Sequence, residues 1–392
     1  MKKLLMGLSA ALLAAFAGAL AAAAETTLKI GFVNTFTGGG AVIGKQQRAG
    51  FDLALEELKG MIGGLKTEVL YEDDKMRPDA GIAIAEKLIK QDKVNFIVGV
   101  IWSNVMMAML PQIAESKTFF IGTGGGPGPL AGKLCNPYFF STAGNNDQVP
   151  EALGKLLNDK GVDDIVAMAP NYQAGKDMIA GLRRVYKGKV QSEILTNLGQ
   201  TDYQPELSQL RAKKPKAVFI FYPGQMGIAF MKQWAAAGLG KDIALYTGGT
   251  IDWSTLPAIG KDAVGTFHTV WWSPDLPNAA NQKFVAAFKA KFGFMPEHYA
   301  AQTYDAVYLI DSAVKAVKGN LSDPDALRTA LRKADFASVR GEFKYNVNHF
   351  PIQDVLQREV VLGADGALAI VSRGAVLKAH KDSYHEQCGM KW

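Results

Sequence analysis

The sequence is poor in the residues from which reactive centres are built. Its 392 residues include two cysteines and five histidines. Cys135 and Cys388 lie too far apart for a CxxC redox motif, and no cluster of Cys and His has the spacing of a zinc site. The GxSxG and HExxH motifs are absent, and so is a pair of carboxylates typical of a glycosidase. We therefore expect no enzyme, no cofactor and no metal site.

An excess of charge of one sign is also missing. The chain has 43 basic and 37 acidic residues, and Lys and Arg are scattered singly among the acids. No basic stripe interleaved with aromatic residues occurs, which argues against a nucleic-acid partner. Hydrophobic residues make up 48% of the chain, which is enough for a substantial core.

One long apolar segment stands at the N-terminus. Lys2 and Lys3 precede an apolar run over residues 4–20, and residues 22–24 are alanines that fit a small-x-small cleavage site. No later run reaches the roughly 18 residues of a membrane span. We expect a signal peptide over residues 1–24, cleaved before Glu25, rather than an uncleaved anchor. No cysteine lies near the cleavage site, so the mature chain is expected in the periplasm without a lipid anchor.

The two cysteines fit this compartment. An oxidising environment favours a disulfide between Cys135 and Cys388 that pins the C-terminal tail. Two unpaired thiols are the alternative. In the same tail, the histidines and acidic residues between positions 380 and 386 are more typical of a solvated terminus than of a metal site.

Strand-like and helix-length segments alternate over residues 28–246, the pattern of a parallel, doubly wound sheet. Most strand candidates are near-continuous apolar runs, as expected when helices cover both faces of a sheet. The candidates are residues 28–34, 68–71, 96–100, 118–121, 165–168, 217–222 and 243–247. Three extended segments, residues 139–143, 267–273 and 343–350, are predicted to cross between two lobes and form a hinge.

Helices are expected between these strands. Phe51, Ala54, Leu55 and Leu58 follow the i, i+3, i+4, i+7 spacing of an amphipathic helix. Residues 228–237 are predicted to form another helix, ended by Gly238 in a left-handed conformation. Residues 279–292 and 298–317 are also predicted to be helical, and the chain is expected to end in short strand-like pieces and a polar tail.

Several short motifs occur in the order and spacing of one known family. They are Ile30-Gly31-Phe32 with Thr37-Gly38, the helix over residues 50–58, Tyr71-Glu72-Asp73-Asp74 followed by Pro78, Val98-Gly99 with Ser103, Asn136-Pro137-Tyr138-Phe139-Phe140, and Tyr304-Asp305-Ala306. On these motifs the chain resembles the branched-chain amino-acid (Leu/Ile/Val) type of periplasmic solute-binding protein, which serves ABC importers. The resemblance covers essentially the whole mature chain.

This resemblance implies an α/β protein of two Rossmann-like lobes with parallel sheets, joined by a three-strand hinge, with the ligand cleft between them. The first lobe is expected to comprise residues 25–141 and 272–347, and the second lobe residues 142–271 and 348–392. The resemblance also implies a monomer that delivers its ligand to the permease subunits of a transporter.

Ligands of open parallel sheets bind beyond the carboxyl ends of the strands, so the loops at those ends are the candidate site. Ser103 and Asn104 follow one strand, where a serine can cap the next helix and the free N–H groups suit a carboxylate. A cap without a ligand contact is the alternative, although the family resemblance places a ligand-contacting serine here.

A glycine-rich loop follows the next strand and begins with Gly122, Thr123 and Gly124. It lacks the spacing of a nucleotide-binding loop, so phosphate binding is not expected. Glycines let the backbone approach a ligand closely, and Thr123 adds a hydroxyl. We favour Thr123 and its neighbours as donors to a carboxylate over a merely flexible turn.

Five loop aromatics carry the expected specificity. Under the family comparison they fall at or near the cleft: Phe36, Trp102, Tyr172, Tyr222 and Tyr304. Taken singly, each is more typical of a core or rim residue. Several at one cleft would enclose an aromatic ring and bury on the order of 150–250 Å² per partner. Trp271 and Trp272 are assigned to the hinge instead.

A counter-charge for an ammonium group is missing from the expected site. Amino-acid binders of the resembled family need an acidic side chain, commonly in a second-lobe turn, but that turn contains Thr247, Gly248 and Gly249. A buried, unpaired ammonium costs several kcal/mol. The expected ligand is therefore an aromatic carboxylate such as a benzoate or phenylpropenoate, unless Asp252 or Asp305 reaches the site. A branched-chain or other apolar amino acid, and a ligand sensor on the same fold, are the alternatives.

Overall fold

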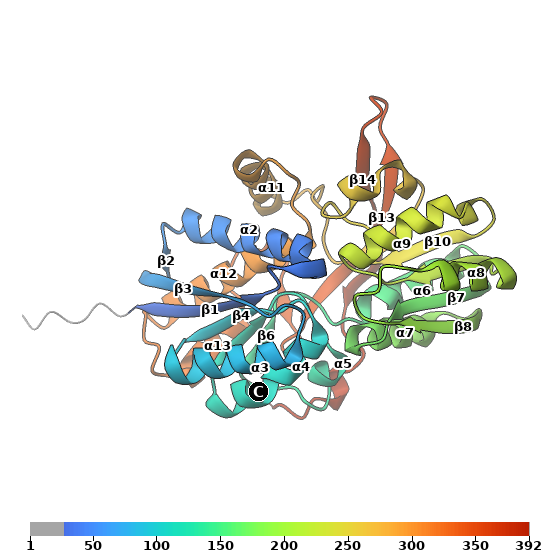
Figure 1. Cartoon of the computed structure of the whole chain (residues 1–392). Helices are drawn as coiled ribbons and strands as arrows, with labels where there is room; N and C mark the ends of the chain where they lie inside the picture. Colours follow the sequence, from blue (N-terminus) through green and yellow to red (C-terminus); the bar gives the residue numbers. More distant parts are fainter. Residues whose placement is uncertain (1–26, 392) are drawn as a thin grey trace, which may run out of the picture.

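Two β-sheets, each covered by helices, form two lobes that lie side by side (Figure 1). This computed structural model describes residues 27–391, so the predicted signal peptide lies outside the described residues. The α/β class with two lobes is confirmed. Both sheets are parallel at their centres and carry antiparallel strands at an edge, so they are mixed rather than purely parallel.

The first sheet has six strands, in the order β2-β3-β1-β4-β5-β6. Their bounds are β1 Leu28–Asn34, β2 Met61–Ile62, β3 Leu65–Asp73, β4 Phe96–Gly99, β5 Phe119–Gly122 and β6 Phe139–Ser141. Ile30 and Phe32 belong to one apolar cluster with Phe51, whereas Val33 belongs to the other cluster with Val105. Strand β1 is therefore apolar on both faces, because helices cover both faces of the sheet.

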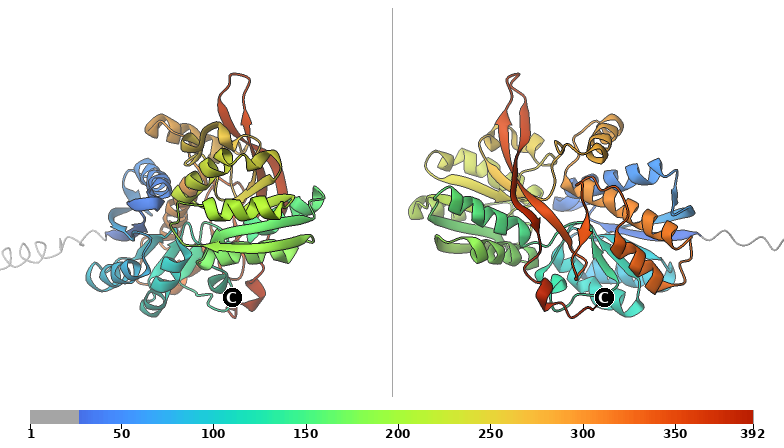
Figure 2. Two further views of the ribbon diagram at one scale, coloured as in Figure 1. Left: turned by 45° about the vertical axis from the view of Figure 1, so that its right-hand side comes forward. Right: turned by 180° about the vertical axis from the view of Figure 1, so that it is seen from behind.

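The second sheet has eight strands, in the order β12-β13-β11-β10-β9-β7-β8, with β14 paired to β13. Their bounds are β7 Asp164–Pro170, β8 Lys189–Thr196, β9 Ala217–Ile220, β10 Ala244–Gly248, β11 Phe267–Val270, β12 Lys344–Tyr345, β13 Pro351–Leu362 and β14 Leu368–His380. The last two form a hairpin whose tip projects beyond the lobe (Figures 1 and 2). The expectation of short strand-like pieces at this end of the chain was wrong.

Helices pack on both sheets. After the second-lobe helices, the chain returns to the first lobe for its last three α-helices. In the first lobe they are α2 Ala41–Glu57, α3 Pro78–Glu86, α4 Ser103–Ser116, α5 Gly128–Ala131, α11 Ala279–Phe292, α12 His298–Ala316 and α13 Pro324–Lys333. In the second lobe they are α6 Gln148–Asp159, α7 Gln173–Val185, α8 Gln204–Lys213, α9 Gln225–Ala236 and α10 Leu256–Ile259. As predicted, Gly238 is left-handed just beyond α9, with a φ of 67°.

Hydrogen bonds connect the segments that cross between the lobes. The Ser141 amide donates to the His349 carbonyl at 3.0 Å. The Arg340 guanidinium donates to the Ala143 carbonyl at 3.0 Å and to Gln353 Oε1 at 2.8 Å. The predicted lobe boundaries stay a prediction. Within the range expected in the first lobe, β12 pairs with β13 of the second sheet.

The C-terminal tail returns to the first lobe. Cys388 is bonded to Cys135, which confirms the expected disulfide. The tail before it is only partly solvated: Lys381, Ser383, Glu386 and Gln387 are exposed, but Asp382 is 1% exposed and His380 Nε2 lies 2.5 Å from Glu151 Oε2. Buried polar contacts and a covalent bond therefore hold this end of the chain.

A buried ion pair joins the lobes. Glu297, directly before α12 in the first lobe, accepts a hydrogen bond at 2.9 Å from Arg358 on β13 of the second lobe. The two side chains are 0% and 1% exposed. Glu297 also accepts from the Trp253 amide of the second lobe at 3.0 Å. Burial would raise the pKa of Glu297, but Arg358 and His298 hold it well below its usual range.

We expect His349 to make stability depend on pH. Its ring stacks on Phe140 and its Nδ1 lies 2.8 Å from the Phe139 carbonyl, and burial lowers its pKa to about 3. Between pH 6.5 and 3 the unfolded chain binds a proton that the folded chain does not, so stability falls as the pH falls. Going from pH 7 to 5 should cost about 2 kcal/mol through this residue.

Urea unfolding at both pH values measures this effect. His349→Asn, which cannot titrate and suits the residue's positive φ of 61°, should lack that part of the pH dependence. An unchanged difference between the two pH values in the variant would contradict the assignment.

Removing Arg358 should leave Glu297 as an unpaired buried carboxylate. We expect Arg358→Met to lower the free energy of unfolding by about 3–5 kcal/mol, measured by urea unfolding at pH 7. Arg373→Met is the matched control, since Arg373 pairs with Glu359 at 2.8 Å on the same sheet but is 47% exposed. That control should cost less than about 1 kcal/mol. Equal losses in the two variants would show that the buried pair has no special weight.

Candidate functional site

A cavity lies between the lobes, at the carboxyl ends of strands from both sheets. Its first-lobe lining consists of Ile101, Ser103, Gly124, Gly125, His298 and Tyr299. Its second-lobe and hinge lining consists of Asn146, Val149, Tyr172, Ala174, Met178, Phe221, Pro223, Gly249, Thr269, Val270 and Trp271. The cavity has a volume of ≈ 50 Å³, which is room for about four waters.

Aromatic rings form much of the cavity wall. Tyr172 and Phe221 stack with centroids 6.4 Å apart and planes 14° apart. The His298 ring, also in the lining, lies edge-on to Trp271 at 6.2 Å and against Tyr299 at 3.9 Å. A flat, apolar ligand body would find several ring surfaces in the cavity.

Several helices point their N-terminal ends at the cavity. The helices α4 and α12 begin at the lining residues Ser103 and His298. Tyr172 is the N-cap residue of α7, and Val149 is the second residue of α6. The first N–H groups of a helix have no intrahelical acceptor, and its N-terminal end carries a partial positive charge. The cavity is therefore electrostatically suited to an anion.

Ser103 offers a hydroxyl to this anion site. It was predicted as a helix cap, but the cap position is Trp102 and no side-chain cap bond forms there. Instead, Ser103 Oγ accepts from Asn146 Nδ2 at 3.1 Å, and no acceptor for its own proton occurs among residues 27–391. Gly125 lies against it, since an added Cβ there would be 3.1 Å from Ser103 Oγ. The hydroxyl can thus donate into the cavity.

None of the residues that line the cavity within the described chain is Asp, Glu, Lys or Arg. Asp252 Oδ1 accepts instead from the amides of Ser254 and Thr255 at 2.7 and 3.0 Å. Asp305 accepts from Ser338 Oγ at 2.6 Å and from the Val339 amide at 3.1 Å. Both acids are hydrogen-bonded to other groups, so the lining itself offers an ammonium group no acidic side chain.

Two phenols add neutral hydrogen-bond donors. Burial, with Asp177 nearby, raises the pKa of Tyr172. Burial, with Asp252 and Tyr172 nearby, raises the pKa of Tyr299 well above its usual value. Both phenols keep their protons at neutral pH, and both residues line the cavity. They can bind a carboxylate or a ligand hydroxyl without bringing a negative charge.

Four of the predicted site residues line the cavity, namely Ser103, Gly124, Tyr172 and Gly249. Trp102 lies behind the wall, with its ring 6.0 Å from that of Tyr172 and its indole N–H donated to Thr35 Oγ1. The cavity therefore brings together one predicted residue from the loop after each of the strands β4, β5, β7 and β10.

The other predicted residues lie away from this cavity. Thr123 contacts Gln47, and its neighbour Gly122 packs against Phe139. Tyr222 stacks on Phe230 in the second-lobe core, and Tyr304 donates to Glu57 Oε2 at 2.6 Å in the first lobe. Phe36 faces an outer pocket with Arg48 and Phe294. Asn104, Thr247 and Gly248 are not part of the lining either.

Sequence reasoning missed other lining residues, above all His298, Tyr299, Asn146 and Phe221. The assignment of Trp271 to the hinge alone was wrong, because its ring also lines the cavity, whereas Trp272 packs in the first-lobe core. The start of α12 could have been found by asking which helix N-termini reach the strand ends, since His298 is its first residue.

Each helix within residues 27–391 is too short or too polar to span a lipid bilayer. In the same part of the chain, no group of three or more His, Cys, Asp or Glu residues is placed to hold a metal ion.

Comparison with known proteins places this geometry in a family. The sequence model of the periplasmic binding protein family matches residues 27–367. A solute-binding protein of an ABC transporter from R. palustris, solved with benzoate, is 30% identical, with a TM-score of 0.88 over 93% of this chain and 100% of that one.

Two further proteins are similar to this chain over most of its length. A solute-binding protein from Rhodopseudomonas palustris BisB5, solved with 3,4-dihydroxybenzoic acid, is 29% identical, with a TM-score of 0.86 over 91% of this chain and 99% of that one. Leu/Ile/Val-binding protein homolog 6 of Brucella melitensis is 26% identical over 90% of this chain and 93% of its own length. The chain belongs to the periplasmic binding protein family of ABC transporters.

Proposed function

We propose that this protein captures a small aromatic carboxylate, such as a benzoate or phenylpropenoate, by closure of its two lobes. It then delivers the ligand, unchanged, to the permease subunits of an ABC importer. It acts as a monomer in the periplasm, after cleavage of the signal peptide over residues 1–24 and without a lipid anchor.

The observation that carries this proposal is the chemistry of the cavity lining. The lining presents aromatic rings and neutral donors, and it includes no charged Asp, Glu, Lys or Arg among the described residues. An aromatic acid suits both features, because its ring can pack on aromatic lining residues such as Tyr172 and Phe221 and its carboxylate suits the helix N-termini and Ser103.

The relatives support the same ligand class. The R. palustris proteins that are 30% and 29% identical to this chain were solved with benzoate and 3,4-dihydroxybenzoic acid. A carboxylate that accepts a few charge-assisted hydrogen bonds, on a buried ring, is compatible with a micromolar dissociation constant, or about −8 kcal/mol.

A branched-chain amino acid is the second candidate, because the Brucella relatives are named as Leu/Ile/Val-binding homologues. Such a ligand would bring an ammonium group into a cavity with no acidic residue in its described lining, and the candidate acids Asp252 and Asp305 are hydrogen-bonded to other groups. The uncompensated charge would cost several kcal/mol, which favours the aromatic acid.

A thermal-shift screen of the mature protein, refolded to remove carried ligand, tests the ligand class. The panel sets benzoate, 4-hydroxybenzoate and a phenylpropenoate against leucine, isoleucine and valine. At a thousand times its dissociation constant a ligand adds about 4 kcal/mol of stability, so a true ligand should raise Tm by several degrees. We expect shifts with the aromatic acids alone. A shift with the amino acids alone would mean that the counter-charge argument is wrong.

Ser103→Ala should weaken binding of benzoate by about tenfold or more, because a hydrogen bond to a charged group is lost. Isothermal titration calorimetry measures the dissociation constant. Thr123→Val is the matched control, since Thr123 is equally buried and one strand away but contacts Gln47 rather than the cavity. It should bind like the parent. If both variants bind like the parent, the carboxylate does not lie at Ser103.

A further inference from the structure

The tail that follows β14 lies where the two lobes meet. We call residues 381–388 the C-terminal strap. It runs beside α5 at the underside of the molecule (Figure 1), and Cys388 at its end is bonded to Cys135 of the first lobe. The strap is thus covalently attached to the lobe opposite to the one that holds β14.

Tyr384 of the strap packs directly on the first lobe. A Cβ added to Gly128 of α5 would lie 2.9 Å from Cζ of the Tyr384 ring. A Cβ added to Gly132 would lie 3.4 Å from Tyr384 Cβ. A side chain at Gly128 would push the ring away, so this glycine allows the tyrosine to lie against the α5 backbone, and Gly132 adds an ordinary contact.

The same side chain reaches the second lobe with its hydroxyl. Tyr384 donates to Asp147 Oδ2 at 2.9 Å, and Arg184 Nη2 donates to the phenol oxygen at 3.2 Å. Asp147 directly precedes α6, and Arg184 lies on α7. The neighbouring Ser383 donates to Glu151 of α6. One tyrosine therefore contacts both sides of the boundary between the lobes.

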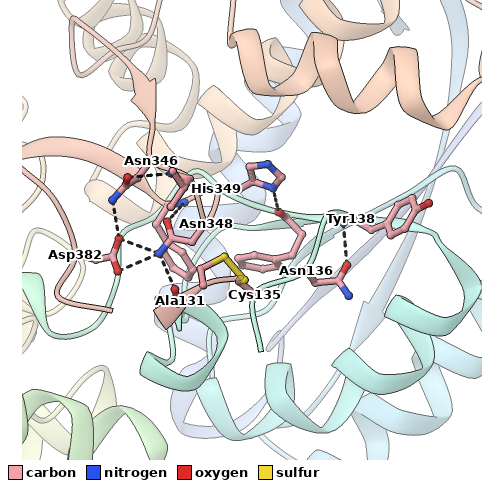
Figure 3. The surroundings of a disulfide bond; sticks show 12 residues. Ala131, Cys135, Asn136, Tyr138, Asn346, Asn348, His349 and Asp382 are labelled. Carbon is pink, nitrogen blue, oxygen red and sulfur yellow. Dashed lines mark hydrogen bonds between the residues drawn. A yellow bond between two sulfur atoms is a disulfide. The ribbon is translucent and has the colours of Figure 1, made fainter. Parts of the chain in front are cut away.

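The strap is also attached to a crossing segment. Asp382 accepts a hydrogen bond from Asn348 Nδ2 at 3.0 Å, and the same amide donates to the Ala131 carbonyl of α5 at 2.7 Å (Figure 3). Asn346 Nδ2 lies 3.4 Å from Asp382 Oδ2. Together with the disulfide, these bonds hold Tyr384 in place on the first lobe.

Contacts continue from the strap to the ligand cavity. Asp147 follows Asn146, whose amide donates to Ser103 Oγ at 3.1 Å and to Asp177 Oδ2 at 2.8 Å. Asp177 of α7 also accepts from the Gly128 amide of α5 at 3.1 Å. Asn146, the neighbour of the Asp147 that Tyr384 contacts, is thus hydrogen-bonded to the serine that faces the cavity.

We propose that Tyr384 is a positioning residue for ligand binding, which holds α5 of the first lobe against α6 and α7 of the second and so favours the closed arrangement. Because the disulfide keeps the strap on the first lobe, opening must break the bonds of the phenol to Asp147 and Arg184. Without the disulfide the strap would be an ordinary chain end, which frays unless it is held. The disulfide raises the effective concentration of Tyr384 beside Asp147 and Arg184.

This proposal rests on the ligand site of the proposed function, and benzoate is the probe. Tyr384→Phe removes the phenol oxygen and keeps the ring. Tyr308→Phe is the matched control, because its hydroxyl also donates to a carboxylate, Glu57 at 2.6 Å, but within the first lobe alone. Each variant loses one hydrogen bond to a carboxylate, so the two can lose similar folding stability. Only Tyr384→Phe removes a contact between the lobes.

Stopped-flow and calorimetric measurements with benzoate decide the matter. We expect Tyr384→Phe to raise the dissociation constant about tenfold through faster release, since apparent affinity scales with the population of the closed state. Tyr308→Phe should bind like the parent, and the double variant Cys135→Ser/Cys388→Ser should behave like Tyr384→Phe. Parental dissociation constants for both Tyr384→Phe and the double cysteine variant would overturn the proposal.

Failure of the proposed function would look different. In that case the parent itself would not bind benzoate, and small-angle X-ray scattering of the ligand-free proteins would decide instead. A larger radius of gyration for Tyr384→Phe and for the double cysteine variant than for the parent and Tyr308→Phe supports the proposal. Equal radii for all four proteins would refute it.

Discussion

The arrangement of the two lobes depends on the buried carboxylate of Glu297. It lies at the start of α12 in the first lobe and accepts hydrogen bonds from Arg358 and the Trp253 amide of the second lobe and from the His298 amide of its own lobe. A buried, unpaired charge is costly, so burial of this carboxylate between the lobes requires the positive charge of Arg358. The next two residues, His298 and Tyr299, line the cavity. The ion pair that joins the lobes therefore also positions one wall of the binding site.

The same principle explains why the cavity suits an anion without a basic side chain in its lining. The acids around it are engaged by hydrogen bonds, Asp177 to the Gly128 amide and Asn146, and Asp252 to the turn before α10. What remains open to the cavity are donors, namely helix N-termini, Ser103 and protonated phenols. Binding an anion through dipoles leaves no buried charge behind when the ligand departs, so the empty site does not have to pair one.

How much could be predicted from the sequence differs between backbone and side chains. The strand at residues 28–34 was predicted with its observed bounds because buried parallel strands are continuous apolar runs, whereas β8 was missed because its polar residues face solvent at the sheet edge. The strand-end rule likewise found Ser103 and Tyr172. It could not tell which way a side chain points. Tyr304 packs in the first lobe, while Tyr299, five residues earlier and about 140° around the same helix, lines the cavity.

The C-terminal tail shows the limit of reasoning from composition. Its polar sequence is that of a solvated end, yet Asp382 is 1% exposed and accepts hydrogen bonds from Asn348. A polar segment gains little from apolar burial, so its ordering entropy must be offset by other bonds. In this tail the cost is offset by a disulfide that closes a loop of 253 residues and by hydrogen bonds from side-chain amides. A tail needed only for stability could have been fastened within one lobe. Its placement across both, with Tyr384 at the boundary, instead couples the end of the chain to the opening of the cleft.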